Sequence, residues 1–198
     1  MHLLLRLLFV IMTTSSTNAL SSIFPKAHHH IPKSQTHTFF DASIPPVLHA
    51  AQNELIHVET YDCFHGLVTP PSSSQDDDPS AIVESLTREQ LNPVTGPIYI
   101  EGAKPGDWLA VTLVDIQPTG LGVGCCGRHS GQLSHWMSHG TTTKFFELSE
   151  NGKIVTMRED DCSKSTTKRL APISFPSCPM LGVIGVAPSG DAPISTMP

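Results

Sequence analysis

The chain of 198 residues has little of what marks several common classes of protein. Only 15% of its residues are charged and 6% are aromatic, and its net charge is -6, so the basic surface that nucleic-acid binding needs is missing. Its five cysteines include no C-x-x-C pair suited to a zinc finger. No apolar run reaches the ~20 residues of a transmembrane helix. The composition argues against a nucleic-acid partner and against a membrane span.

Turn-forming residues are abundant instead. The chain holds 14 glycines and 17 prolines, and its 39% of hydrophobic residues is enough for a packed core. Many short runs punctuated by turns are typical of a mostly β fold. One stretch, Ala81–Gln90, carries apolar side chains at helical spacing and follows Asp78 and Ser80, either of which can cap a helix. The sequence therefore predicts a mostly β protein with one short helix.

The first 19 residues predict a secretory leader. An apolar run from Leu3 to Met12 includes the single positive charge of Arg6 and is followed by small and polar residues up to Ala19. Cleavage near Ala19 would send the protein into the secretory pathway or out of the cell. A mitochondrial or plastid presequence is the alternative, because serine and threonine are frequent and no acidic residue precedes Asp41.

Residues 20–35 show no periodicity and predict a flexible linker. They include Pro25, Pro32 and the triplet His28-His29-His30. Adjacent imidazoles in an unstructured tract lack the outer hydrogen bonds that orient metal ligands. The triplet is therefore left out of the predicted functional site.

The cysteines do not decide whether the protein lies in an oxidising or a reducing compartment. Their number is odd, which permits one or two disulfides and one free thiol in an exported chain. Cys63 lies two residues before His65, but two such residues on a strand do not automatically reach hydrogen-bond geometry. We interpret Cys63 as a buried structural residue. The five are Cys63, Cys125, Cys126, Cys162 and Cys178.

The stretch Leu91–Ile116 holds two strands joined by a turn. A β-branched and aromatic run, Ile98–Ile100, leads through the turn residues Lys104–Asp107 into a second apolar run. Glu101 stands at the end of the first strand, next to Gly102, where the missing side chain lets backbone or a ligand approach closely.

A second carboxylate, Asp62, follows another predicted strand. Residues 55–62 alternate as a strand does and end at Asp62, three residues before His65. One interpretation brings Asp62, His65 and Glu101 together as metal ligands or acid/base groups. The other makes Asp62 a cap of the turn into Gly66, and spacing alone favours it, because no local motif here has ligand spacing.

Four segments resemble, in order, the acetamidase/formamidase family of amide hydrolases. Thr95–Asp107 (TGPIYIEGAKPGD) follows the family pattern T-G-P-[IV]-Y-[IV]-E-G-A-x-P-G-D almost without a break. The other three are His37–Leu48 (HTFFDASIPPVL), Val58–Leu67 (VETYDCFHGL) and Leu181–Pro188 (LGVIGVAP).

The resemblance implies a fold and an extent. It implies an antiparallel β-sandwich or jelly-roll-like core and a domain running from residue 36 to residue 198. Family members continue with a segment of the form H-G-G-N-x-D, which does not appear in this sequence. The chain is therefore expected to match the N-terminal two-thirds of a member, with the C-terminal part missing. Unpaired strand edges then favour association into a homo-oligomer.

The resemblance also implies a reaction, the hydrolysis of a small linear amide such as formamide or acetamide to a carboxylate and ammonia. Because Asp62 and Glu101 stand inside family blocks, we predict both as catalytic, and both with His65 as ligands of a divalent metal. Zinc is the first expectation and calcium the alternative. Such a cation polarises a carbonyl and lowers the pKa of bound water, and a carboxylate can carry the proton.

A prediction from another class competes with the enzyme. Without the His- and Gly-rich segment, the chain is a non-catalytic truncated β-domain that binds a partner or serves as a structural fragment. The absent segment contains the family's densest set of candidate ligands, and a hydrolytic metal site that loses ligands loses affinity and activity together.

Overall fold

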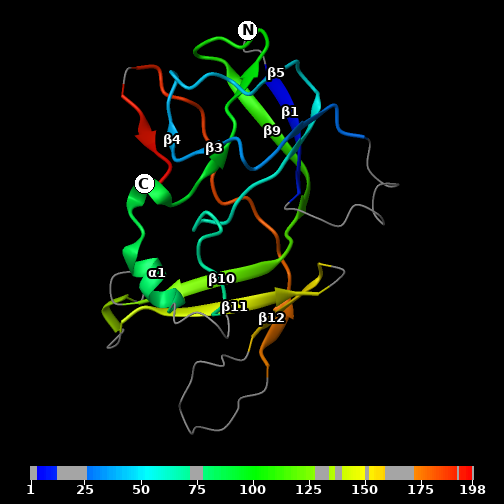
Figure 1. Ribbon diagram of the computed structural model, residues 1–198. Coiled ribbons are helices and arrows are strands. Elements are labelled where there is room, and N and C mark those ends of the chain that lie inside the picture. The colour runs from blue at the N-terminus through cyan, green and yellow to red at the C-terminus, as the bar shows by residue number, and fades with distance from the viewer. Residues whose placement is uncertain are drawn as a thin grey trace, which may run out of the picture. The chain divides into compact units, whose positions relative to one another are not determined.

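A computed structural model describes most of the chain (Figure 1). The chain divides into two compact units, the first made of residues 1–65, 88–117 and 179–198 and the second of residues 66–87 and 118–178. The secondary structure is mostly short strands with one short α-helix, which confirms the predicted class. No helix among the described residues is long and apolar enough to cross a membrane. The structure describes residues 4–12, 26–71, 78–127, 134–136, 140–149, 152–158, 172–190 and 192–197.

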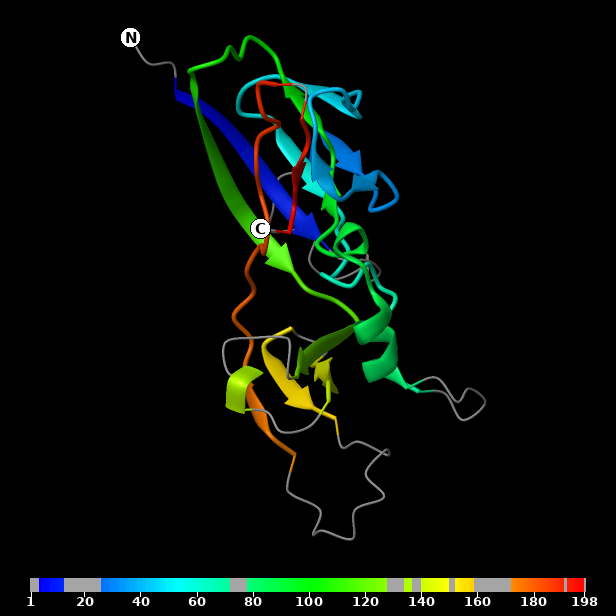
Figure 2. The same cartoon turned by 90° about the vertical axis from the view of Figure 1, so that its left-hand side faces the viewer.

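The largest sheet of the first unit has four strands in the order β2-β6-β1-β9. They are β2 (His29–Ile31), β6 (Leu55–Val58), β1 (Leu4–Met12) and β9 (Trp108–Gln117). All three pairings are parallel, whereas an antiparallel core was predicted. Parallel neighbours require long crossovers, and long stretches of chain do separate these strands in sequence. Figures 1 and 2 both show β1 beside β9.

Three two-stranded sheets complete the first unit. Strand β5 (Leu48–Ala50) pairs in parallel with β8 (Ile98–Ile100). Strand β3 (Thr36–His37) pairs antiparallel with β7 (Val94–Thr95). Strand β4 (Phe39–Phe40) pairs antiparallel with β14 (Ile194–Ser195). Each pair joins segments that are far apart in the sequence.

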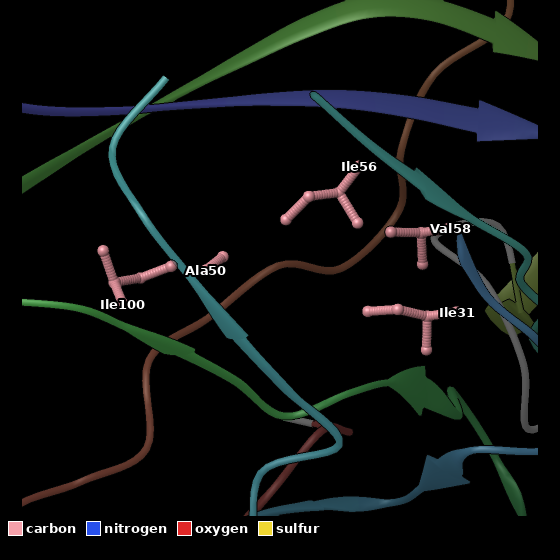
Figure 3. Packing of buried hydrophobic residues seen from close by; sticks show 5 residues of the cluster. All are labelled: Ile31, Ala50, Ile56, Val58 and Ile100. Atoms are coloured by element: carbon pink, nitrogen blue, oxygen red, sulfur yellow. The ribbon is translucent and has the colours of Figure 1, made fainter. Parts of the chain in front are cut away.

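The core of the first unit lies between the β2–β6 strands and the β5–β8 pair. It consists of Ile31, Ala50, Ile56, Val58 and Ile100, with Ile56 fully buried. Figure 3 shows Ile31, Ile56 and Val58 side by side, with Ala50 and Ile100 on the facing pair. Alternate positions of β6 point into this cluster, as the period-two pattern of a strand requires.

Two sequence predictions concern N-terminal residues that lie in the four-stranded sheet of the first unit. The sequence assigns Leu4–Met12 to a cleaved leader, and the structure places these residues as β1 between β6 and β9. The cleavage position at Ala19 lies outside the described residues, so the leader stays a prediction. The flexible linker is wrong for its described part, because His29–Ile31 form β2 and Ile31 is 3% exposed. Residues 29–31 form a strand because they pair with β6, and local periodicity in the sequence does not reveal this pairing.

The second unit contains an antiparallel sheet in the order β10-β11-β12-β13. Helix α1 (Pro79–Ser85) begins at Asp78, whose carboxylate accepts a hydrogen bond from the Ser80 backbone N–H, so the predicted cap is confirmed. The helix ends at Ser85, five residues before its predicted end at Gln90. Ser80 Oγ lies 3.1 Å from Thr143 Oγ1, which ties α1 to β11. The strands are β10 (Leu121–Cys126), β11 (Thr142–Leu148), β12 (Ile154–Met157) and β13 (Ser174–Pro176), and the unit also contains the 3-10 turn η2 (Ser134–Trp136). The 3-10 turn η1 (Arg88–Gln90) belongs to the first unit.

Gly185 brings two of the family-like blocks into close contact. A Cβ atom at this position would lie 2.6 Å from Cζ of Phe40. We expect Gly185→Ala to lower the free energy of unfolding by about 1–3 kcal/mol, because an added methyl overpacks the contact. Urea denaturation measures the change. The matched control is Gly182→Ala, where no atom would lie within 4 Å of the new Cβ; an equal loss in both variants would contradict the packing explanation.

Candidate active site

The turn after β6 carries Asp62 and His65 together. The backbone N–H of Phe64 donates to Asp62 Oδ1 at 2.8 Å, and the N–H of His65 donates to the Asp62 carbonyl oxygen at 3.1 Å. Asp62 therefore holds the turn, as the structural interpretation required, while its side chain remains exposed. His65 has a φ of 60° and is followed by Gly66 at 69°, so the chain reverses through two left-handed residues.

The imidazole of His65 is oriented by an aromatic neighbour. Its ring centroid lies 4.6 Å from that of Tyr61. The ammonium of Lys33 lies 4.9 Å from the centre of the same tyrosine ring, within the range of a cation–π contact. These contacts place a cation, a phenol and an imidazole along one side of the turn.

Glu101 lies just after the end of β8, and its side chain contacts His49 rather than Asp62 or His65. Its backbone N–H donates to the Ala50 carbonyl oxygen at 2.9 Å, which extends the β5–β8 pairing. Its Oε1 lies 3.0 Å from Nδ1 of His49, whose ring packs 4.8 Å from that of Tyr99. The two side chains of the ion pair are 56% and 59% exposed, so the pair contributes little to stability. Gly102 follows with a φ of 80°, and the chain turns there.

The predicted metal centre is not assembled in the described part of the chain. There, no three His, Cys, Asp or Glu side chains are grouped closely enough to hold a metal ion. Asp62 and His65 share one turn, and Glu101 contacts His49 on another strand pair. Imidazole and carboxylate are suitable zinc donors chemically, but the three residues do not meet as one ligand set.

His57 on β6, Glu59 just after it and His30 on β2 are titratable groups outside the predicted site. The ring of His57 lies 4.7 Å from the ring of His30, whose Nε2 lies 3.1 Å from Glu59 Oε1. Burial lowers the pKa of His57, and nearby His30 lowers it further against the opposing effect of Glu59. Burial raises the pKa of Glu59, but hydrogen bonds from the Lys33 backbone and from His30 outweigh it and lower the pKa. The signal available in the sequence was the histidine triplet.

Other predicted residues have clear positions. Cys63 is exposed rather than buried, because it lies in the turn beyond the end of β6. Cys126 and Cys178 are also exposed, and Cys125 is half-buried. Cys162 lies outside the described residues. In the second unit, His135 is exposed, and its ring centroid lies 5.7 Å from that of Trp136.

Comparison with known proteins establishes the family. The chain matches the Acetamidase/Formamidase family over residues 25–196, and it belongs to this family. The match begins before the predicted start at residue 36 and includes β2. No curated protein matches the chain significantly.

Two solved structures are similar to this chain. An acetamidase from Bacillus halodurans shows 28% identity and a TM-score of 0.61, over 84% of this chain and 48% of that one. A recombinant predicted acetamidase/formamidase from Thermoanaerobacter tengcongensis shows 24% identity and a TM-score of 0.58 over the same shares, a likeness that concerns the fold alone. The chain thus spans about half the length of these solved relatives.

Proposed function

We propose that this chain serves the hydrolysis of a small linear carboxamide, of the size of formamide or acetamide, to a carboxylate and ammonia. The observation that carries the proposal is the family match over residues 25–196, which includes both blocks that hold Asp62 and Glu101. The similar Bacillus halodurans protein is described as an acetamidase.

The reaction needs a nucleophile and a proton donor, because an amide is a poor electrophile and its amine is a poor leaving group. In the proposed mechanism a carboxylate removes a proton from the attacking water and delivers a proton to the departing nitrogen. Asp62 and Glu101 are the carboxylates assigned to these roles. His65 carries protons between the turn and solvent, and its ring is positioned against Tyr61.

The direct test is ammonia release by the purified natural protein. Formamide, acetamide and propionamide are supplied as substrates, with a peptide amide as a bulky comparison. We expect turnover of the small amides and none of the peptide amide. Absence of ammonia release from every amide would reject the hydrolase proposal for this chain.

A second candidate function is a non-catalytic binding domain. It is favoured by the exposed apolar side chains of one extended segment, in which Met180 is 76% exposed and Val186 is 73% exposed. Adjacent exposed apolar residues commonly mark contact sites for another polypeptide. Light scattering on the same preparation distinguishes the candidates, because a binding domain would associate without releasing ammonia.

A further inference from the structure

Four histidines lie where β2 meets β6. The backbone N–H of Leu55 donates to Nδ1 of His28 at 2.9 Å. His29 Nε2 lies 3.0 Å from Glu54 Oε2, and His30 Nε2 lies 3.1 Å from Glu59 Oε1. The fourth, His57, packs its ring against that of His30. We refer to His28, His29, His30 and His57 as the histidine cluster.

Two members of the cluster hold their places only when neutral. His28 accepts a hydrogen bond at Nδ1, and an imidazole protonated on both nitrogens has no acceptor left. His57 has a buried Nε2 for which the described part of the chain provides no hydrogen-bond partner. A proton there would create a charge that is poorly solvated and close to His30.

The other two members gain attraction when protonated, but their gain is small. The side chains of His29 and Glu54 are 31% and 28% exposed, and those of His30 and Glu59 are 51% and 20% exposed. Pairs with this access to water contribute little. Acidification therefore destabilises the cluster at His28 and His57 by more than it stabilises the cluster at the two ion pairs.

No further charge in the described surroundings reverses this balance. Glu54 also acts on His28, and Glu59 is the carboxylate that acts on His57. The backbone of Lys33 donates to Glu59. Strand β1 lies on the other side of β6, and its backbone register places Val10 opposite His57.

The sign of the pH dependence follows from the two neutral histidines. Because burial lowers the pKa of His57 in the folded chain, the unfolded chain binds more protons once the pH falls below about 6.5. This contribution to stability is complete above that pH and is lost as the pH falls. Protonation of His28 on both ring nitrogens would also remove the acceptor of the Leu55 N–H.

We propose that the histidine cluster is a pH-sensitive contact that holds β2 against β6 at neutral pH and releases β2 in acid. Release takes Ile31 out of the core, where it is 3% exposed. It also breaks the hydrogen bond from the Glu59 N–H to the Ile31 carbonyl oxygen, 3.0 Å long, three residues before Asp62. Acid therefore loosens the turn that carries Asp62 and His65, whatever reaction that turn serves.

Hydrogen exchange tests the proposal on the unaltered protein at pH 7 and pH 5, with rates corrected for intrinsic exchange. We expect protection of the amides of β2 and β6 to be clearly lower at pH 5 than at pH 7, because the lowered pKa of His57 makes protonation favour the opened chain. The amides of β10 and β11, in the other unit, serve as the internal reference. Equal protection of β2 and β6 at both pH values, or the same fall in β10 and β11, would overturn the proposal.

Variants assign the effect to particular rings. The double variant His28→Asn/His57→Phe keeps an acceptor for the Leu55 N–H and a ring beside His30, and we expect its β2 protection to be unchanged between the two pH values. The control His29→Gln/His30→Gln should keep the acid-induced fall. The reverse pattern would refute the assignment. If the first variant does not fold, NMR titration of the unaltered protein decides, because His57 must titrate in the pH range where protection falls.

Discussion

Glu101→Gln and Asp62→Asn each lower the rate of amide hydrolysis by about 100-fold or more, the scale of a general acid/base group. Both changes keep the size and shape of the side chain and remove its ability to exchange a proton. In Asp62→Asn the amide oxygen can still accept from the Phe64 N–H, so the turn is expected to remain. Steady-state kinetics of ammonia release in the natural protein measures the effect.

The matched control is Glu147→Gln. Glu147 is an exposed carboxylate of the second unit, in an ion pair with Arg158 at 3.2 Å, and its loss should leave turnover unchanged. Thermal unfolding of all three variants separates lost chemistry from lost fold. Normal turnover in the first two variants would assign Asp62 to the turn and Glu101 to its contact with His49.

Ile56→Ala lowers the free energy of unfolding by about 2–5 kcal/mol. Ile56 is fully buried between Ile31, Val58 and the β5–β8 pair, so truncation leaves a cavity in the centre of the first unit (Figure 3). A loss of this size is a large fraction of the stability of an ordinary domain. Urea denaturation monitored by circular dichroism gives the value.

Ile184→Ala is the control for this effect. The same side chain is 57% exposed at that position, and surface substitutions of this kind usually change stability by less than about 0.5 kcal/mol. Similar losses at the two positions would show that the cluster around Ile56 is not the core of the unit.

Local signals in the sequence located several elements correctly. The run Ile98–Ile100 is strand β8, and the following turn closes with the Asp107 N–H donating to the Lys104 carbonyl oxygen at 3.0 Å. The helix at residues 79–85 begins at its predicted cap. Turn residues, a β-branched run and a capping carboxylate act through neighbouring backbone, so their effects are visible without knowledge of the fold.

Long-range pairing was not visible in the same way. Strand β6 was predicted to run to Asp62 and ends at Val58, and its partner β2 ends at Ile31. A polar histidine triplet gives no strand periodicity, so its order comes from pairing with β6. Cys63 is exposed because the strand stops before it.

The sequence by itself determined the mostly β class, the short helix, the family and the two carboxylates that stand in its blocks, because these depend on residue type and local spacing. The tertiary structure decided that the largest sheet is parallel, that β2 belongs to the core, and that Asp62 and His65 share a turn while Glu101 contacts His49. It also brought His28, His29 and His30 next to strand β6, which carries His57. Such contacts join residues tens of positions apart, and only the folded chain fixes which of them meet.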